Sequence, residues 1–333
     1  MSALDSAIVT LLTPADKLRA GLLRRSGPVG RKLIADRQLR INTLALAGIS
    51  TSLAFTAGAP LWLLVVGPLV LGVPHLLADV RYLVVRPGLH RSGAWWLLCA
   101  APLALMFAVS APWVGALAVL GGAAWSRARP WLWLAALALL GLALARPDAT
   151  TWVMLHLHNL VAVALWWTWR EGSRRRLIPV LAFAAVYAAI LFGALDGLLI
   201  GAHTITRVPA DVPRGALFSG IAGGLPAPWD VRVVASFAFA QSVHYMIWLR
   251  WIPEDDRRRY TPRPLLATYR ALRDDFHLVG LMVFAGLAAA IWALSLVDLS
   301  EARDGYYRLA AFHAWLELAC IVRLVTLRQR VKP

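Results

Sequence analysis

Residues 60–85 read PLWLLVVGPLVLGVPHLLADVRYLVV, an apolar run that carries one histidine, His75, and one acid, Asp79. About 20 consecutive apolar residues suffice for a helix to cross a bilayer, so the run predicts a membrane-spanning helix. His75 and Asp79 are four residues apart and share one face of that helix. Pro74 frees a backbone carbonyl upstream and is expected to kink the helix, which lets these side chains reach the bundle axis.

The rest of the chain has the same apolar character. The 333 residues are 59% hydrophobic and only 16% charged, with a mean hydropathy of +0.63. Soluble domains normally carry about 25% charged residues. The composition therefore excludes an ordinary cytosolic enzyme, a disordered chain and a fibrous protein. It predicts an all-α, polytopic membrane helix bundle.

Apolar runs and helix breakers divide the chain into about ten expected transmembrane helices. The fourth and fifth are short enough to form a re-entrant pair instead. The expected spans are 42–58, 60–85, 94–111, 113–126, 131–146, 151–169, 178–200, 232–252, 277–297 and 307–327.

Basic residues give an independent indication of orientation, because they collect in the cytoplasmic loops of membrane proteins. With the N-terminus inside, the inner segments hold 28 of the 34 basic residues and the outer segments hold six. This asymmetry predicts ten spans with both termini cytoplasmic, in a multi-pass protein of the bacterial inner membrane. It also accounts for the net charge of +16 without a nucleic-acid partner. The inner segments are 1–41, 81–93, 127–130, 170–177, 250–276 and 323–333.

Two segments outside the spans have open interpretations. Residues 1–41 mix Leu and Ile with Lys and Arg, as expected of a cytoplasmic amphipathic helix on anionic lipid or of a solvated basic tail. Residues 42–333 form the single transmembrane helical domain. Its outer loop 201–231 is rich in Gly and Pro, and is either a lid over an outward opening or a plain connector.

Ionisable side chains inside a membrane are costly, and they usually face the bundle interior at a functional site. Four expected spans carry histidine. The sixth has both His156 and His158, which lie about 200° apart on a helix and therefore cannot both face one point. The sequence does not choose between these two histidines.

Two later spans add polar side chains at helical spacing. In the eighth, His244 lies on one stripe with Gln241, Tyr245 and Trp248, at positions i, i+3, i+4 and i+7. In the tenth, His313 and Glu317 repeat the four-residue spacing of His75 and Asp79.

Histidines from separate helices predict a metal site, because neutral imidazole is the most common metal ligand in proteins. Carboxylates one turn away are expected either to bind the metal or to orient the rings. A histidine and carboxylate set with open positions suits non-haem Fe(II). The expected metal ligands are His75, His244, His313 and one of His156 and His158, with Asp79 and Glu317 as further ligands or partners.

The segment Gly72-Val73-Pro74-His75-Leu76-Leu77-Ala78-Asp79 is similar to the Gly-x-Pro-His-Gly-x-x-Asp signature of Brp/Blh-type β-carotene 15,15′-dioxygenases. The resemblance implies a multi-span bacterial membrane enzyme with iron held by histidines on several helices, which uses O2 to cleave a carotenoid into retinal. Leu76 stands where the family has glycine, and the family's later His-x3-His element has no counterpart after His244.

These observations favour an integral-membrane, metal-dependent oxidoreductase of the oxygenase type. We expect Fe(II), O2 and a lipophilic substrate, carotenoid-like or lipid, that enters sideways from the bilayer. Tyr245 and Gln241 are expected to donate hydrogen bonds to bound O2 or to the substrate. The alternatives are a bis-histidine haem protein that transfers electrons and a transporter or proton relay that uses buried His, Asp and Glu. The chain has no Walker A loop, dinucleotide fingerprint or nucleophile elbow.

Overall fold

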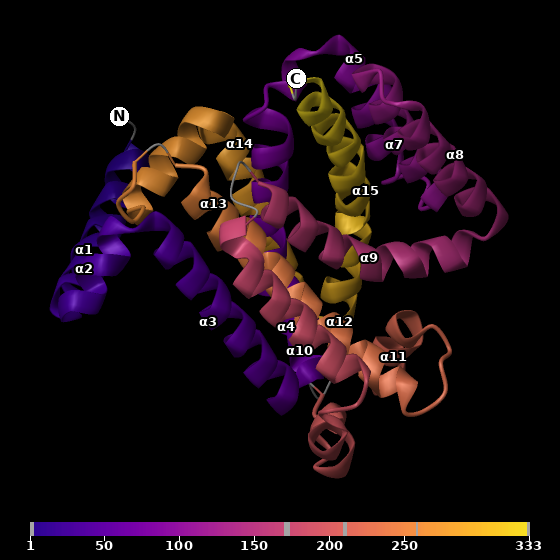
Figure 1. Ribbon diagram of the computed structural model, residues 1–333, viewed down its shortest axis with the longest axis horizontal. Coiled ribbons are helices and arrows are strands. Elements are labelled where there is room, and N and C mark those ends of the chain that lie inside the picture. The colour runs from indigo at the N-terminus through magenta and orange to yellow at the C-terminus, as the bar shows by residue number, and fades with distance from the viewer. Residues whose placement is uncertain (1–2, 170–173, 209–211, 258, 332–333) are drawn as a thin grey trace.

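The structure is a computed structural model that describes residues 3–169, 174–208, 212–257 and 259–331. Every regular element in these ranges is helical (Figure 1). The helices that carry the bundle are α1 (Ala3–Arg25), α2 (Gly27–Ala35), α3 (Arg37–Gly58), α4 (Pro60–Asp79), α7 (Pro112–Ser126), α8 (Pro130–Ala145), α9 (Pro147–Thr168), α10 (Leu177–Leu191), α11 (Arg214–Ala222), α12 (Trp229–Met246), α14 (Leu265–Ser295) and α15 (Leu299–Val331).

Short helical pieces join or extend these helices. The short α-helices are α5 (Gly93–Trp95), α6 (Ala101–Leu105) and α13 (Ile252–Asp255). Four π-helical turns are η1 (Val80–Val85), η3 (Trp96–Ala100), η5 (Gly197–Gly201) and η7 (Ile247–Trp251). Three 3₁₀ turns are η2 (Leu89–Arg91), η4 (Arg174–Arg176) and η6 (Thr204–Thr206).

Within the described residues, five helical stretches are long and apolar enough to cross a membrane. Three shorter apolar stretches are Gly93–Leu105, Pro130–Ala145 and Leu177–Leu191. The five long ones are Arg37–Gly58, Pro60–Val85, Pro147–Thr168, Leu265–Ser295 and Leu299–Thr326. The chain is therefore helical with several candidate membrane spans, as its composition predicted.

Some helix ends differ from those that the apolar runs predicted. The seventh expected span, 178–200, is interrupted where α10 ends at Leu191 and Gly193 adopts a positive φ of 93°. Beside this break Asp196 forms an ion pair of 2.5 Å with Arg232. The ninth expected span begins at His277, where α14 bends at a φ of 57°. Apolar content alone does not locate such breaks.

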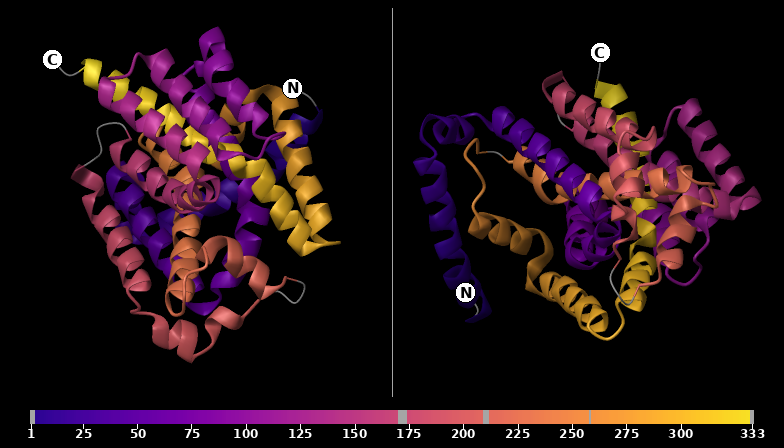
Figure 2. Two further views of the ribbon diagram at one scale, coloured as in Figure 1. Left: turned by 90° about the vertical axis from the view of Figure 1, so that its right-hand side faces the viewer. Right: turned by 90° about the horizontal axis from the view of Figure 1, so that it is seen from below.

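Small residues let α7 approach α15 closely. A Cβ on Gly115 would lie 2.3 Å from the ring of Trp315, and one on Gly122 would lie 2.8 Å from the carbonyl oxygen of Ala319. In a membrane, where lipid is as apolar as leucine, such close contact is a main source of helix association. Helix α15 also packs against α4, α9 and α14, and α12 packs against α3, α4, α9 and α10 (Figures 1 and 2). The histidine-bearing helices α4, α9, α12 and α15 are thus neighbours.

The N-terminal segment is helical and is held against α14. Asp5 pairs with Arg273 at 2.5 Å and accepts a hydrogen bond from Tyr269. Asp16 accepts the backbone N–H groups of Leu265 and Leu266 at the start of α14, at 2.7 and 3.0 Å, which caps that helix. The basic segment therefore has a fixed position in the fold.

One end of the bundle gathers the basic segments of the sequence, and we call it the basic end. At this end, buried or half-buried ion pairs connect the parts of the chain around residues 40, 81, 176, 255 and 275. They are Arg40–Glu254 at 2.7 Å, Arg81–Asp275 at 2.6 Å, Arg86–Asp275 at 2.8 Å and Arg176–Asp255 at 2.5 Å. These ion pairs join four of the six segments that the sequence predicted to lie inside.

Candidate metal centre

Four helices bring one imidazole each to a single buried cluster. His75 lies on α4, His158 on α9, His244 on α12 and His313 on α15, and each is at most 8% exposed. The ring centroids of His75 lie 5.1 Å from His244 and 4.9 Å from His313. Those of His158 lie 5.1 Å from His244 and 5.0 Å from His313. Histidines far apart in sequence therefore occupy one small volume.

Backbone carbonyls fix the orientation of three of these rings. The Nδ1 of His75 donates to the carbonyl oxygen of Gly72 at 2.8 Å, and that of His158 donates to Met154 at 3.0 Å. The Nδ1 of His313 donates to the carbonyl of Ala310. A carbonyl oxygen only accepts hydrogen bonds, so in each neutral ring Nδ1 carries the proton and Nε2 keeps its lone pair. Three rings thus have Nε2 ready to act as a ligand atom.

His244 is held differently. Its Nε2 lies 3.8 Å from Oε1 of Glu317, and that oxygen accepts the indole N–H of Trp248 at 2.9 Å. Within the described residues, neither nitrogen of His244 has a hydrogen-bond partner, although both are buried. The Trp248 bond orients Glu317 toward His244, which gives this histidine a carboxylate neighbour.

Asp79 completes the group that fits a cation. Its Oδ2 lies 3.4 Å from Nε2 of His75, and the protein offers neither of its oxygens a hydrogen bond in the described part of the chain. One ligand atom from each of His75, Asp79, His244 and His313 lies within 4.8 Å of all the others. Unpaired buried carboxylate oxygens are costly. A positive ion at the centre of this group removes that cost, so the donor set fits a metal.

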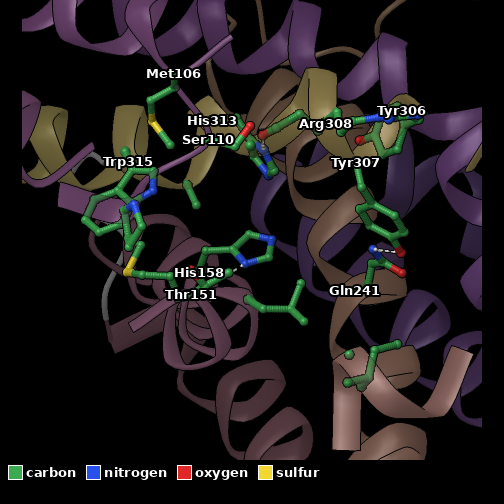
Figure 3. Close-up of a pocket in the computed structure, with 18 of the residues that line it drawn as sticks. Met106, Ser110, Thr151, His158, Gln241, Tyr306, Tyr307, Arg308, His313 and Trp315 are labelled. Atoms are coloured by element: carbon green, nitrogen blue, oxygen red, sulfur yellow. Dashed lines mark hydrogen bonds between the residues drawn. The ribbon is translucent and has the colours of Figure 1, made fainter. Parts of the chain in front are cut away.

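A cavity of about 440 Å³ opens onto the cluster. His75, His158, His244 and His313 all line it, and Figure 3 labels His158 and His313 among the side chains around it. Most of the remaining wall is apolar, and includes Met106, Met154, Phe237 and Trp315. This cavity can therefore hold a lipophilic molecule beside the cluster.

Several polar side chains also line this cavity. Tyr245 packs its ring on His75 at a centroid distance of 5.0 Å. The side-chain amide of Gln241 donates to the hydroxyl of Tyr307 at 3.3 Å (Figure 3). The hydroxyl of Tyr306 lies 3.3 Å from Nδ1 of His75. The two residues that the sequence suggested as hydrogen-bond donors, Tyr245 and Gln241, both face the cavity.

His156 lies outside the cluster. Its Nε2 donates to the carbonyl oxygen of Ile221 at 3.0 Å, and Trp152 donates to the same oxygen at 2.9 Å. Ile221 belongs to α11, in the loop 201–231, and lines the cavity. The sequence left open which of His156 and His158 belongs to the site. The structure places His158 in the cluster, whereas His156 holds α11 at the cavity through its hydrogen bond to Ile221.

The remaining histidines are also away from the cluster. His203 is exposed in the loop 201–231, where it adopts a φ of 54°. His90 lies near the basic end, and its backbone carbonyl accepts the indole N–H of Trp96 at 2.8 Å. His277 occupies the bend of α14.

The sequence did not assign Tyr306 and Tyr307 to the site. It also did not identify Trp248 as the hydrogen-bond partner of Glu317. Tyr306 precedes His313 by seven residues, two helical turns, so the spacing placed both on one face. Trp248 was placed on one stripe with His244, but its bond to Glu317 gave no signal, because Glu317 lies on another helix. Tyr307 likewise meets its partner Gln241 from another helix.

No protein-family model matches this chain, and neither a curated protein nor a solved structure matches it.

Proposed function

We propose that this chain is an integral-membrane, metal-dependent oxidoreductase of the oxygenase type. Fe(II) would be held by the imidazoles of His75, His158, His244 and His313, with Asp79 and Glu317 as further ligands or as partners of the rings. The observation that carries the proposal is the convergence of four imidazoles from four helices, three of them with the same tautomer fixed by a backbone carbonyl.

The surroundings of the cluster support oxygen chemistry on a lipophilic substrate. The bound metal would supply redox chemistry on O2. The apolar cavity would bind the substrate, carotenoid-like or lipid, and exclude water. Gln241, Tyr245, Tyr306 and Tyr307 supply hydrogen-bonding groups around the cavity, suited to orient O2 or a polar group of the substrate.

The proposed placement is the bacterial inner membrane, crossed ten times, with the basic end and both termini in the cytoplasm. Its support is the distribution of basic residues in the sequence together with the ion pairs that join the predicted inner segments. The cavity then lies nearer the outer face, below α11.

Elemental analysis and an absorption spectrum of the purified protein test the function. We expect stoichiometric iron without a Soret band. A strong Soret band would favour the bis-histidine haem protein, and a protein without metal would favour the transporter or proton relay. The close edge contacts among four rings favour a single ion over a macrocycle between two of them.

Two histidine variants sharpen this test. His75→Ala should insert and fold but lose most of its iron, because it removes a ring that contacts both His244 and His313. His203→Ala is the matched control, because His203 is exposed and outside the cluster, and it should keep its iron. Full iron content in His75→Ala counts against the proposal.

A further inference from the structure

Helix α1 lies at the edge of the molecule (Figures 1 and 2) and uses only part of its surface to contact the protein. It packs against α2 and α14. Asp5 pairs with Arg273 of α14, and Asp16 caps the start of the same helix. At about 100° per residue, these two acids lie close together around the axis of α1. They therefore identify the face of α1 that is held against α14.

Four leucines run along a different face of α1, and we call them the leucine stripe. They are 7, 7 and 4 residues apart, which places them within about 40° of one another and about 130° from the face that contacts α14. Single exposed leucines are ordinary, but a continuous apolar row on a charged helix indicates a surface that binds an apolar partner. The four are Leu4, Leu11, Leu18 and Leu22, which are 41%, 76%, 66% and 57% exposed.

The same segment carries exposed cations, whereas its acids are already used within the protein. Asp5 and Asp16 bind α14, and Asp36 caps α3 by accepting the N–H of Leu39 at 3.0 Å. These are the three acids of residues 3–36. The surface that carries the leucine stripe is therefore basic. Five exposed cations of α1 and α2 form no ion pair within the described part of the chain: Lys17, Arg24, Arg25, Arg31 and Lys32.

Two candidate membrane spans begin beside this segment. Helix α2 is followed directly by α3, which is a candidate span from Arg37 onward. Helix α14, to which α1 is held, bends at His277 and continues with exposed apolar residues such as Val279 and Val283. In the proposed membrane placement, α1 and α2 therefore lie near the level of the lipid headgroups.

The charges distinguish a lipid surface from a second copy of the chain as the partner of the leucine stripe. Two copies in contact through identical stripes would bring their unpaired cations together, and this repulsion opposes association. An anionic bilayer instead accepts leucines at the boundary between headgroups and acyl chains, and its phosphates attract lysine and arginine. The apolar row and the cations therefore both match an anionic lipid surface.

We propose that the leucine stripe and the cations of α1 and α2 bind anionic phospholipid at the cytoplasmic face, an inference that rests on the proposed membrane placement. The leucines insert at the boundary between headgroups and acyl chains, and the cations bind lipid phosphates. Because α1 is held to α14 by Asp5 and Asp16, this lipid site has a fixed position in the protein. Anionic lipid should therefore be enriched beside α1 relative to the lipid around the apolar spans.

The test uses the full-length protein in nanodiscs that contain phosphatidylcholine and phosphatidylglycerol. In a background without Cys99 and Cys320, an NBD fluorophore is attached at Leu11→Cys. It is quenched either by nitroxide-labelled phosphatidylglycerol or, at the same mole fraction, by nitroxide-labelled phosphatidylcholine. We expect a preference of about fivefold for the anionic lipid, the contribution of one cation near an anionic surface. At the control position Val283→Cys, which is exposed on the candidate span of α14, both lipids should quench equally.

Charge variants show whether the cations cause the preference. Lys17→Gln combined with Arg24→Gln should remove most of the preference for phosphatidylglycerol at Leu11→Cys. Arg129→Gln combined with Arg146→Gln removes the same charge from two exposed residues at the ends of α8, and should leave the preference unchanged. High salt should weaken the preference of the wild type, because it screens exposed charges.

Several results would overturn the proposal. One is equal quenching by the two lipids at Leu11→Cys, and another is a preference that survives the loss of Lys17 and Arg24. Quenching by aqueous iodide alone would place the leucine stripe in water. Protection from iodide and from both lipids would place another protein surface over it.

Iron content, measured on the same samples, separates this inference from the oxygenase proposal. No residue of α1 lines the cavity beside the histidines, so the charge variants should keep their iron. A failed lipid test with normal iron overturns the lipid site alone, and a lipid preference without iron overturns the oxygenase proposal alone. A protein that does not enter nanodiscs overturns the membrane placement and the lipid site together.

Discussion

Gly72→Ala tests the packing that shapes the metal centre. The carbonyl oxygen of Gly72 accepts the hydrogen bond that orients His75, and its Cα faces the ring of Tyr306. A Cβ at this position would lie 2.2 Å from one ring carbon of Tyr306 and 2.4 Å from another. Carbon atoms normally pack about 3.5–4.0 Å apart, so the ring must move by about 1 Å or more.

The energetic cost follows from where that ring sits. Tyr306 is 1% exposed and contacts Tyr307 at a centroid distance of 5.7 Å, so it has little room to move. Inserting a methyl group into such a core costs about 1–3 kcal/mol. We expect Gly72→Ala to lower the free energy of unfolding by about that amount, and to reduce iron content by displacing His75.

Detergent-solubilised protein, unfolded by SDS titration and followed by tryptophan fluorescence, provides the measurement. Gly141→Ala is the control, because Gly141 lies inside α8 with nothing within 4 Å of a new Cβ, and alanine there should stabilise the helix by about 0.5–1 kcal/mol. In a Tyr306→Val background, Gly72→Ala should cost almost nothing, because the clashing ring is gone. A Gly72→Ala protein with wild-type stability and iron content would refute this reasoning.

Three further predictions concern the rest of the molecule. Glu254→Ala leaves Arg40 buried without its carboxylate and should lower the free energy of unfolding by about 3–5 kcal/mol. The double variant Arg40→Met with Glu254→Leu should recover most of that loss in the same SDS titration. In a background without native cysteines, a membrane-impermeant maleimide should label His203→Cys in intact cells but Arg259→Cys only after permeabilisation; the reverse pattern would invert the orientation. Removing the metal with a chelator should lower the melting temperature of the wild type, because a ligand present at about 100 times its Kd stabilises the folded state by about 2.7 kcal/mol.

Much of this fold was predictable because membrane-spanning helices are specified by long apolar runs. The stretches 60–85 and 151–169 were located closely, since a bilayer requires every backbone group in them to bond within the helix. The break after Leu191 was not, because apolar content does not show the positive φ of Gly193 or the ion pair between Asp196 and Arg232 beside it, two residues far apart in the sequence.

The candidate site was predictable to the extent that spacing along one helix determines which side chains share a face. His75 with Asp79 and His313 with Glu317 were identified in this way. The choice between His156 and His158 required the position of α11, because only the carbonyl of Ile221 shows what His156 contacts. The contact between Trp248 and Glu317 likewise joins two helices, and no periodicity within either helix predicts it.

The proposal that imidazoles from separate helices bind one ion is tested most directly on the two histidines of α9. His156→Gln and His158→Gln remove the same side chain two residues apart, and only His158 belongs to the cluster. Iron per chain and iron K-edge X-ray absorption should show wild-type occupancy and histidine scattering for His156→Gln, and reduced occupancy or one imidazole fewer for His158→Gln. Equal iron and equal spectra in the two variants, or no iron in the wild type, would contradict the account.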